Sequence, residues 1–585
     1  MTRYAPPRHR RFAVLLLALA LLLTGCGGGR QEPAPLDPDQ YGPGEYPYEM
    51  TTFDRMAYRR PDMDALEALF TEAADLADEA TSDDTEALTA LVERCWDAYD
   101  EFYTMGTLAM LRSDIDQSDE AMMTEYEFCQ DNEIRMDELL DRLLVACAGS
   151  RAKVPSYLLA GYDQGDAVPY TDRQLELMNR EGVLLVAYWR AMMLDEIRLN
   201  GETVSYLDVI SDPYITDEAY QEARLAYARA CNEAAAPIYI ELIRVRRDMA
   251  DAFGYDSYEA MQYDSFLRDY TPEQVKLYLR RLADTFAGPS RQLLAADPYS
   301  LISYDSLSPS ALLAWLHEAV SGMGERVNAA YDFMEEYELY DVYSSASKAP
   351  GAYTIYLDSY AAPFVFLGAY GDVEDFLDLS HEFGHFVDAY VNYNATGSLD
   401  LAEMYSQAMA NLAVLRSRDD LGDDAYRNLL LIHLVDMLNV FTEQAAYADF
   451  ESQAYSLPDE ELTVENLNAL ALACGNRFGS VAPGDEELTS LYWAQVTHLF
   501  ESPFYIISYC VSADTAAQIA ALEYGERGAG VAVYEDLLDW ETDSLLSEAE
   551  RVGLESPFSP GRSASNLTFI LQLLDDAASR LAPAA

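Results

Sequence analysis

The residues best suited to chemistry are the five of the segment His381-Glu382-Phe383-Gly384-His385. If residues 377–390 form an α-helix, the two histidines lie about 40° apart around its axis, so both imidazoles can reach one metal ion. Glu382 projects about 100° from His381, beside such an ion, where a carboxylate can act as general base toward a bound water. Two imidazoles with a carboxylate suit zinc best among the divalent ions. The segment therefore predicts a hydrolytic site with one Zn²⁺ per chain, bound by His381 and His385.

A hydrolytic zinc site needs a third protein ligand and an open position for water. The turn signal Thr396-Gly397-Ser398 follows the segment, and residues 399–415 resume a helical pattern. A helical hairpin of this kind brings Glu403 back to the level of the histidines, with Asp400 one turn earlier as the alternative ligand. Glu403 is therefore the predicted third ligand.

Two acidic residues, Asp378 and Asp388, share the histidine face of this helix. Either carboxylate could accept the second ring N–H of a histidine and fix its tautomer; the alternative is that both are solvated surface acids. The opposite face carries the apolar residues that would anchor the helix in a core, namely Phe376, Leu379, Phe383, Phe386, Val387 and Tyr390.

The elements that must position these residues are mostly helical, because apolar residues recur at spacings of three and four along much of the chain. The predicted helices are residues 63–80, 83–103, 119–148, 217–253, 272–287 and 309–336. Residues 351–370, directly before the histidines, are instead aromatic and β-branched and predict a short β-hairpin. An edge strand there, with residues 364–370 as the candidate, could hold an extended peptide by strand addition. A purely structural hairpin is the alternative.

The N-terminus has the pattern of an export signal. Four arginines within the first eleven residues precede an apolar run, residues 12–23, that is shorter than the about 20 residues a membrane span needs. The run ends in Leu23-Thr24-Gly25-Cys26, which resembles the lipobox of bacterial lipoproteins. This resemblance implies a signal peptide over 1–25, lipid on Cys26, and a flexible tether over 26–45 at the outer face of a membrane. An ordinary cleaved signal is the alternative.

Charge and cysteine usage limit the function classes. The formal net charge of −63 repels phosphate backbones and anionic lipid, so we expect no nucleic-acid partner and no membrane contact except through the lipid on Cys26. The six other cysteines are scattered without a C-x-x-C pair. This spacing predicts buried free thiols or one or two incidental disulfides, and no cysteine-based zinc site.

Four blocks of sequence resemble the thimet oligopeptidase and oligoendopeptidase F family of zinc metallopeptidases. They are residues 243–258, which end in Phe253-Gly254-Tyr255-Asp256-Ser257-Tyr258; the element Lys348-Ala349-Pro350-Gly351-Ala352-Tyr353; the histidine segment with Glu403-Met404-Tyr405-Ser406-Gln407; and His498 with Phe504, Tyr505 and Tyr509. The similarity covers residues 235–515. It supports Glu403 as a ligand, because the family carries a glutamate in an E-x-x-S segment.

The late block has a role in that family. The resemblance implies that His498, Tyr505 and Tyr509 reach into the cleft and stabilise the oxyanion of the tetrahedral intermediate. A phenol or imidazole donor suits this task because negative charge develops on the carbonyl oxygen during attack. From the residues alone, both tyrosines could equally be core aromatics in a chain with 43 tyrosines.

The resemblance also implies a fold. We expect a mainly α, two-lobed, clam-like fold with a deep central channel, zinc at its floor, and a small β-hairpin beside the motif helix. Residues 46–230 would form a helical part of the channel wall, and residues 231–585 the catalytic domain. Such a channel admits extended oligopeptides and excludes folded proteins.

Two departures from the family pattern bear on the metal site. The family usually has a second glutamate seven residues after the ligand glutamate, where this chain has Ala410. The interval from His381 to Glu403 is also shorter than the family's. A lost supporting carboxylate could weaken metal affinity, but neither change removes a group that the reaction needs.

These observations predict a zinc-dependent endopeptidase that hydrolyses short oligopeptides at the outer face of a bacterial membrane, with a monomer as the expected state. One alternative is an enzyme that resembles a dipeptidyl-carboxypeptidase, which would need a cationic site for the terminal carboxylate of the substrate. The other is a peptide-binding lipoprotein with weak or no turnover, made conceivable by Ala410. Glu382 argues against it, because a binder needs no base beside the metal.

Overall fold

The computed structural model describes residues 41–579, apart from 160–170, 195, 211, 213, 297–301, 304–305, 346 and 419–420. The predicted signal peptide, Cys26 and the tether up to residue 40 lie outside the described residues. The chain forms two compact units, each made of two stretches: unit 1 is Met1–Pro169 with Asp305–Thr396, and unit 2 is Tyr170–Tyr304 with Gly397–Ala585. The predicted start of a catalytic domain at residue 231 falls inside a helix of unit 2, so that division stays a prediction.

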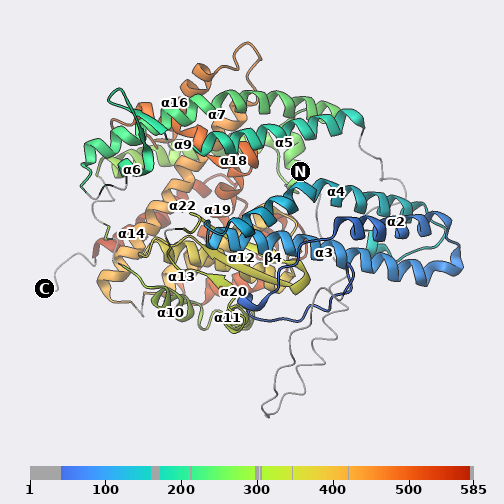
Figure 1. Cartoon of the computed structure of the whole chain (residues 1–585). Coiled ribbons are helices and arrows are strands. Elements are labelled where there is room, and N and C mark those ends of the chain that lie inside the picture. Colours follow the sequence, from blue (N-terminus) through green and yellow to red (C-terminus); the bar gives the residue numbers. More distant parts are fainter. Residues whose placement is uncertain are drawn as a thin grey trace. The chain divides into compact units, whose positions relative to one another are not determined.

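Three long helices pack side by side in unit 1 (Figure 1): α2 (Met63–Glu79), α3 (Thr85–Ile115) and α4 (Glu120–Gly149). The carboxylates of Asp62 and Asp119 cap α2 and α4 by accepting backbone N–H groups of the first turn. Apolar side chains from all three helices, among them Phe70, Trp96 and Leu143, form one buried core. The predicted helical pattern is confirmed here, with α3 extending beyond its predicted end.

The single helix predicted over residues 309–336 is wrong. The structure has two helices, α10 (Pro309–Val320) and α11 (Glu325–Glu336). Between them Gly322 and Gly324 have φ angles of 75° and 117°. A right-handed helix cannot contain such angles, and glycine adopts them at little steric cost, so the chain breaks here.

The hairpin predicted before the histidines is confirmed. Strands β4 (Ala352–Leu357) and β5 (Ala362–Leu367) pair antiparallel, and β3 (Tyr340–Asp341) pairs parallel with the other edge of β5. The strand order is β3-β5-β4, and all six residues of β5 are buried. The prediction that residues 364–370 form a substrate-binding edge is therefore wrong, because both edges of β5 are paired. Strand β4 is an outer strand of this sheet, on the side of β5 opposite to β3.

The histidine segment lies on α12 (Asp375–Asn392), which packs against β4 and β5. The predicted apolar back of this helix is buried, apart from Tyr390, which is half-buried. At its start the Asp375 carboxylate accepts backbone N–H groups from Tyr370, Gly371 and Asp372 at 2.9, 2.8 and 3.2 Å. These bonds to the buried Asp375 carboxylate hold the connection between β5 and α12. The start of α12 is therefore fixed relative to the sheet.

Unit 2 is almost entirely helical. Helices α5 (Asp172–Met192) and α7 (Asp217–Phe253) lie side by side (Figure 1), and the small hairpin β1 (Glu196–Leu199) and β2 (Glu202–Ser205) connects them with α6 (Tyr206–Ile210). The other helices are α8 (Tyr258–Ser265), α9 (Pro272–Ala295), α13 (Leu399–Arg416), α14 (Asp423–Asn439), α15 (Ala445–Ala454), α16 (Val464–Phe478), α17 (Glu486–Tyr492), α18 (Thr497–Glu501), α19 (Ile506–Gly525), α20 (Ala529–Leu537), α21 (Leu545–Arg551) and α22 (Arg562–Ser579). The mainly α fold class is confirmed.

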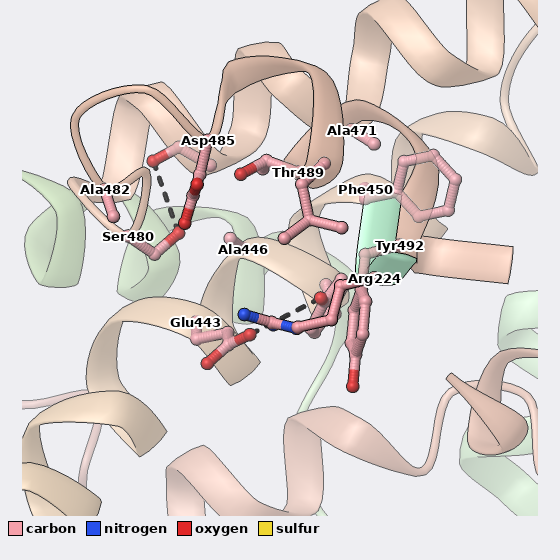
Figure 2. Close-up of a pocket in the computed structure, with 13 residues that line it drawn as sticks. Arg224, Glu443, Ala446, Phe450, Ala471, Ser480, Ala482, Asp485, Thr489 and Tyr492 are labelled. Atoms are coloured by element: carbon pink, nitrogen blue, oxygen red, sulfur yellow. Dashed lines mark hydrogen bonds between the residues drawn. The ribbon is translucent and has the colours of Figure 1, made fainter. Parts of the chain in front are cut away.

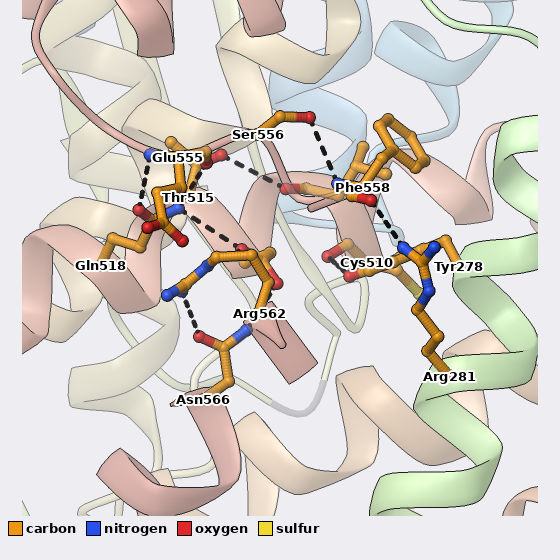
Figure 3. A network of polar contacts seen from close by, with 12 residues as sticks. Tyr278, Arg281, Cys510, Thr515, Gln518, Glu555, Ser556, Phe558, Arg562 and Asn566 are labelled. Atoms are coloured by element: carbon orange, nitrogen blue, oxygen red, sulfur yellow. Dashed lines mark hydrogen bonds and ion pairs between the residues drawn. The ribbon is translucent and has the colours of Figure 1, made fainter. Parts of the chain in front are cut away.

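Helix α19 is fixed at several points in unit 2. Tyr278 of α9 donates to the Cys510 carbonyl at 2.8 Å, and the buried Asp514 accepts from Arg562 and Asn566 of α22 at 3.1 and 2.6 Å (Figure 3 shows this region). Helix α19 also packs extensively against α13, where Ser512 donates to the Asp400 carbonyl at 2.7 Å. These contacts therefore fix the position of α19 relative to α13.

Two further expectations concern burial. The six described cysteines are buried free thiols, which confirms one of the two outcomes predicted from their spacing. Among the described residues, one continuous helical stretch, Asp423–Ala454, is long and apolar enough to cross a membrane, and 67% of its most apolar window is buried within the protein. That degree of burial is typical of a core helix.

Candidate metal centre

The two histidines of α12 lie as their spacing predicts. The ring centroids of His381 and His385 are 5.0 Å apart, and their possible ligand nitrogens lie within 4.8 Å of each other. Burial lowers the pKa of His381 to about 4, and burial together with the neighbouring His381 lowers the pKa of His385 well below its usual range. Both imidazoles are therefore neutral near pH 7, the form that binds a metal ion.

The predicted base, Glu382, is held by the outer strand of the hairpin. This residue is 7% exposed, and the hydroxyl of Thr354 in β4 lies 2.8 Å from Glu382 Oε2 and 2.8 Å from the Glu382 carbonyl oxygen. A hydroxyl that lies within hydrogen-bond distance of both groups orients the carboxylate relative to the helix backbone. Sequence reasoning missed Thr354, although it lies in the strand that the hairpin pattern identified.

The two acids on the histidine face are not solvated surface acids. Asp388 is buried and accepts from Asn392 Nδ2 and Thr396 Oγ1, both at 2.7 Å, so it closes the C-terminal end of α12. Asp378 lies near other acids, and burial with Glu374, Asp375 and Asp372 raises its pKa to about 7. None of these contacts involves a histidine, so the role of either acid in fixing a histidine tautomer stays a prediction.

The burial of Asp388 predicts a pH effect on stability. Burial raises the pKa of Asp388 from 3.8 to about 6 against the opposing effect of its two hydrogen bonds. A raised folded-state pKa makes this group most favourable to folding at low pH, and that contribution is lost as the pH rises from about 4 through 6. Asp388→Asn keeps an oxygen acceptor without the charge. We expect it to be more stable than wild type at pH 8, by up to about 3 kcal/mol, and to lose this advantage at pH 4.

Chemical denaturation of both proteins between pH 4 and 8 measures this difference. The comparison of variant with wild type at each pH cancels the titration of all other groups. A stability difference that does not change between pH 4 and 8 contradicts the assignment.

The predicted third ligand lies on α13. Glu403 is 2% exposed, and burial raises its pKa to about 7, although the hydroxyl of Tyr505 donates a hydrogen bond to its carboxylate. Its rival Asp400 lies one turn earlier and forms a buried ion pair with Arg268, with Asp400 Oδ1 3.6 Å from Arg268 Nε. Asp400 thus has a structural partner within unit 2, which favours Glu403 as the ligand.

The residues of the late block lie together in unit 2. The ring centroids are 5.1 Å apart for His498 and Tyr505, 5.8 Å for His498 and Tyr509, and 5.2 Å for the two tyrosines. The Tyr509 hydroxyl lies 3.2 Å from His498 Nε2, and burial lowers the pKa of His498. Glu403 and these three residues therefore form one polar group in unit 2, and His381, Glu382 and His385 form another in unit 1.

The position of the family's second glutamate is filled by a small apolar residue. Ala410 is 9% exposed, and Asn411 beside it is 5% exposed. No carboxylate therefore stands at this position of α13, and the departure from the family pattern remains.

A separate pocket of about 220 Å³ lies in unit 2 and contains none of the candidate residues (Figure 2). It is lined by α7, the π-helical turn Val440–Gln444 and helices α15 to α17, and Glu443, Tyr447 and Tyr492 contribute to its walls. The side chain of Glu443 lies 3.5 Å from the Tyr447 hydroxyl, and burial raises its pKa. This pocket is therefore distinct from the predicted site.

Known proteins resemble this chain in sequence and fold. The peptidase M3 N-terminal domain matches residues 53–153, and peptidase family M3 matches residues 327–541. Oligopeptidase PepF of Bacillus subtilis (strain 168) is 25% identical over 209 residues, which are 34% of this chain and 31% of that protein. The match thus spans about a third of the length of this relative.

Two solved structures are similar over nearly the whole chain. One, provisionally named oligoendopeptidase F, has a TM-score of 0.72 at 23% identity and is covered completely by 90% of this chain. PZ peptidase A, solved with an inhibitor, has a TM-score of 0.71 at 20% identity, also covered completely by 90% of this chain. These similarities show the fold.

The two M3 family matches together cover more than half of the chain, and the second contains every candidate residue from His381 to Tyr509. Three of the four blocks lie inside the second match, and residues 243–258 lie outside both matches. The resemblance to the family is therefore confirmed, and the chain belongs to peptidase family M3, a family of metallopeptidases.

Proposed function

We propose that this protein is a zinc-dependent endopeptidase that hydrolyses short oligopeptides. The observation that carries the proposal is the arrangement on α12, where two neutral imidazoles lie one turn apart and flank a buried carboxylate held by Thr354. A structural helix has no need of a desolvated histidine pair beside an acid, since burying such groups costs free energy.

The donor set fits zinc. His381, His385 and Glu403 would hold the ion, two through neutral nitrogens and one through a carboxylate oxygen, which is the ligand set of many hydrolytic zinc sites. When bound, Zn²⁺ supplies a Lewis acid that lowers the pKa of water and polarises the scissile carbonyl. Burial raises the pKa of Glu403, because it is costly to remove a charged carboxylate from water. A bound cation would offset this cost.

The other residues move protons and stabilise charge. Glu382 accepts a proton from the attacking water at its carboxylate and returns it to the leaving amine, while Thr354 keeps that carboxylate oriented. Tyr509 and His498 supply donors for the oxyanion that develops on the scissile carbonyl, and Tyr505, which donates its hydroxyl proton to Glu403, orients that carboxylate beside them.

The substrate would bind as an extended chain. Strand β4 has one edge paired with β5, and its first four residues are half-buried. An oligopeptide that adds to the second edge of β4 would pass beside Thr354 and therefore beside Glu382. The names of the relatives, an oligopeptidase and an oligoendopeptidase, support peptides of this kind. The lipobox-like segment at Cys26 supports a location at the outer face of a bacterial membrane.

Hydrolysis of internally quenched peptides of about ten residues tests the proposal. We expect the purified protein to cleave them at internal bonds, to lose activity when a chelator removes the metal, and to regain it when about one equivalent of zinc is added back. Mass spectrometry of the products distinguishes internal cleavage from release of C-terminal dipeptides. A metal-loaded protein that binds such peptides without cleaving any would favour the peptide-binding alternative.

A further inference from the structure

Tyr505 lies in a short connection with an unusual backbone, between the helices that carry His498 and Tyr509. We call residues 500–508 the Phe504 loop; it comprises the last two residues of α18, the connection 502–505 with Tyr505, and the first residues of α19. Phe504 has a φ angle of +63°, a left-handed conformation that is strained for a residue other than glycine. Such a conformation persists only where surrounding contacts enforce it.

Arg268 supplies the central contacts. Its side chain is fully buried, and its Nη2 donates to the Phe504 carbonyl and to Ser508 Oγ, both at 2.7 Å. Its guanidinium carbon also lies 4.6 Å from the centre of the Tyr263 ring. Through the same guanidinium it pairs with Asp400, on the turn of α13 just before Glu403. One side chain therefore links the helix of the proposed ligand to the loop that carries Tyr505.

Two more buried polar side chains hold the loop. Glu451 of α15 accepts the Phe504 backbone N–H at 2.8 Å, so both polar backbone groups of Phe504 are bound by buried side chains. Arg246 of α7 donates to the Phe500 carbonyl and is itself held by Glu181 at 2.7 Å. The side chains of Arg246 and Arg268 are 0% exposed and therefore costly to bury, and both bind the backbone of this one short segment.

We propose that Arg268 is a positioning residue that keeps Tyr505 and the adjoining His498 and Tyr509 in register with Glu403. The inference rests on the proposed function for its consequence in catalysis, but the contacts themselves do not depend on turnover. Glu403 accepts a hydrogen bond from the Tyr505 hydroxyl, and Arg268 holds the segments on both sides of this bond, through the Asp400 side chain and the Phe504 carbonyl. Lysine cannot replace it, because a single ammonium lacks the planar fork that reaches these groups together.

Steady-state kinetics on quenched peptides measure the effect. Arg268→Lys is expected to lower kcat by about tenfold to a hundredfold with KM within about threefold, because the donors shift while substrate binding remains. Ser508→Ala, which removes one acceptor and no charge, is expected to lower kcat by about threefold to tenfold. Arg281→Lys is the matched control: Arg281 donates to the Phe558 carbonyl at 2.6 Å (Figure 3), a tie outside the Phe504 loop, and kcat should not change.

A double-mutant cycle separates positioning from general destabilisation. In a Tyr505→Phe background, Arg268→Lys should have a smaller effect on kcat than in wild type, because one of the groups that it positions is already absent. Additive effects of the two substitutions, or an unchanged kcat in both Arg268→Lys and Ser508→Ala, would overturn the proposal.

A second measurement needs no turnover. In protein labelled with ¹⁵N in its histidine rings, the His498 signals, assigned by their loss in His498→Gln, should shift in Arg268→Lys and stay in place in Arg281→Lys. Unshifted His498 signals in Arg268→Lys overturn the proposal even if wild type cleaves peptides. If wild type cleaves no peptide but the signals shift, the proposed function fails and the positioning role stands.

Discussion

Glu382→Gln is expected to lower kcat/KM for peptide hydrolysis by about 10³-fold while the protein keeps its zinc. Glutamine has nearly the shape of glutamate and can still receive the Thr354 hydroxyl on its amide oxygen. It cannot accept a proton at neutral pH, so both proton transfers, from the attacking water and to the leaving amine, lose their catalyst. General acid–base catalysis contributes typically 10²–10⁴-fold, and one carboxylate performs both steps here.

The measurement combines the rate on quenched peptides with metal analysis of the same samples. Glu374→Gln is the matched control, because this glutamate precedes the same helix, has a pKa raised by burial, and lies outside the candidate site. Its rate should equal that of wild type. If Glu382→Gln cleaves peptides as fast as wild type with zinc bound, Glu382 is not the base and the mechanism must be abandoned.

The helix that carries the two histidines was predictable, because its candidate metal ligands and its buried apolar residues both recur with the helical period. The residues His381 and His385 share one face, and Phe383 and Phe386 lie on the other, so the helical pattern placed both the histidine pair and the buried back correctly. The break between α10 and α11 was missed although Gly322 and Gly324 mark it in the sequence. The apolar spacing continues across the break, so periodicity alone does not reveal that φ becomes positive at these glycines.

The role of the hairpin strands was misjudged for a related reason. Residues 362–367 are apolar without alternation, which is typical of a strand buried on both faces, whereas a partly exposed outer strand carries polar residues such as Thr354. Arg268 gave no signal at all. Its partners Asp400, Phe504 and Ser508 lie 132 to 240 residues away along the chain, and only the tertiary fold brings them together.

Glu403→Ala is expected to lose zinc, whereas Asp400→Asn should keep it. Both acids lie on α13 one turn apart, and the sequence left either as the third ligand. The structure separates them by their partners. Asp400 neutralises the buried Arg268, while the carboxylate of Glu403 accepts a hydrogen bond from the neutral hydroxyl of Tyr505. Removal of a zinc ligand should weaken zinc affinity by more than about 100-fold, the upper range for outer-shell partners.

Zinc per folded chain, measured after dialysis against a weak chelator, tests this assignment, with circular dichroism as the check on folding. Asp400→Asn leaves Arg268 without its counter-charge, so its thermal midpoint and kcat should fall while its zinc content stays near one equivalent. Glu403→Ala should instead fold and contain little zinc, with activity reduced by at least about 10³-fold, because the loss of the ion removes the Lewis acid that every later step requires. Stoichiometric zinc in Glu403→Ala together with zinc loss in Asp400→Asn would reverse the assignment and make Asp400 the ligand.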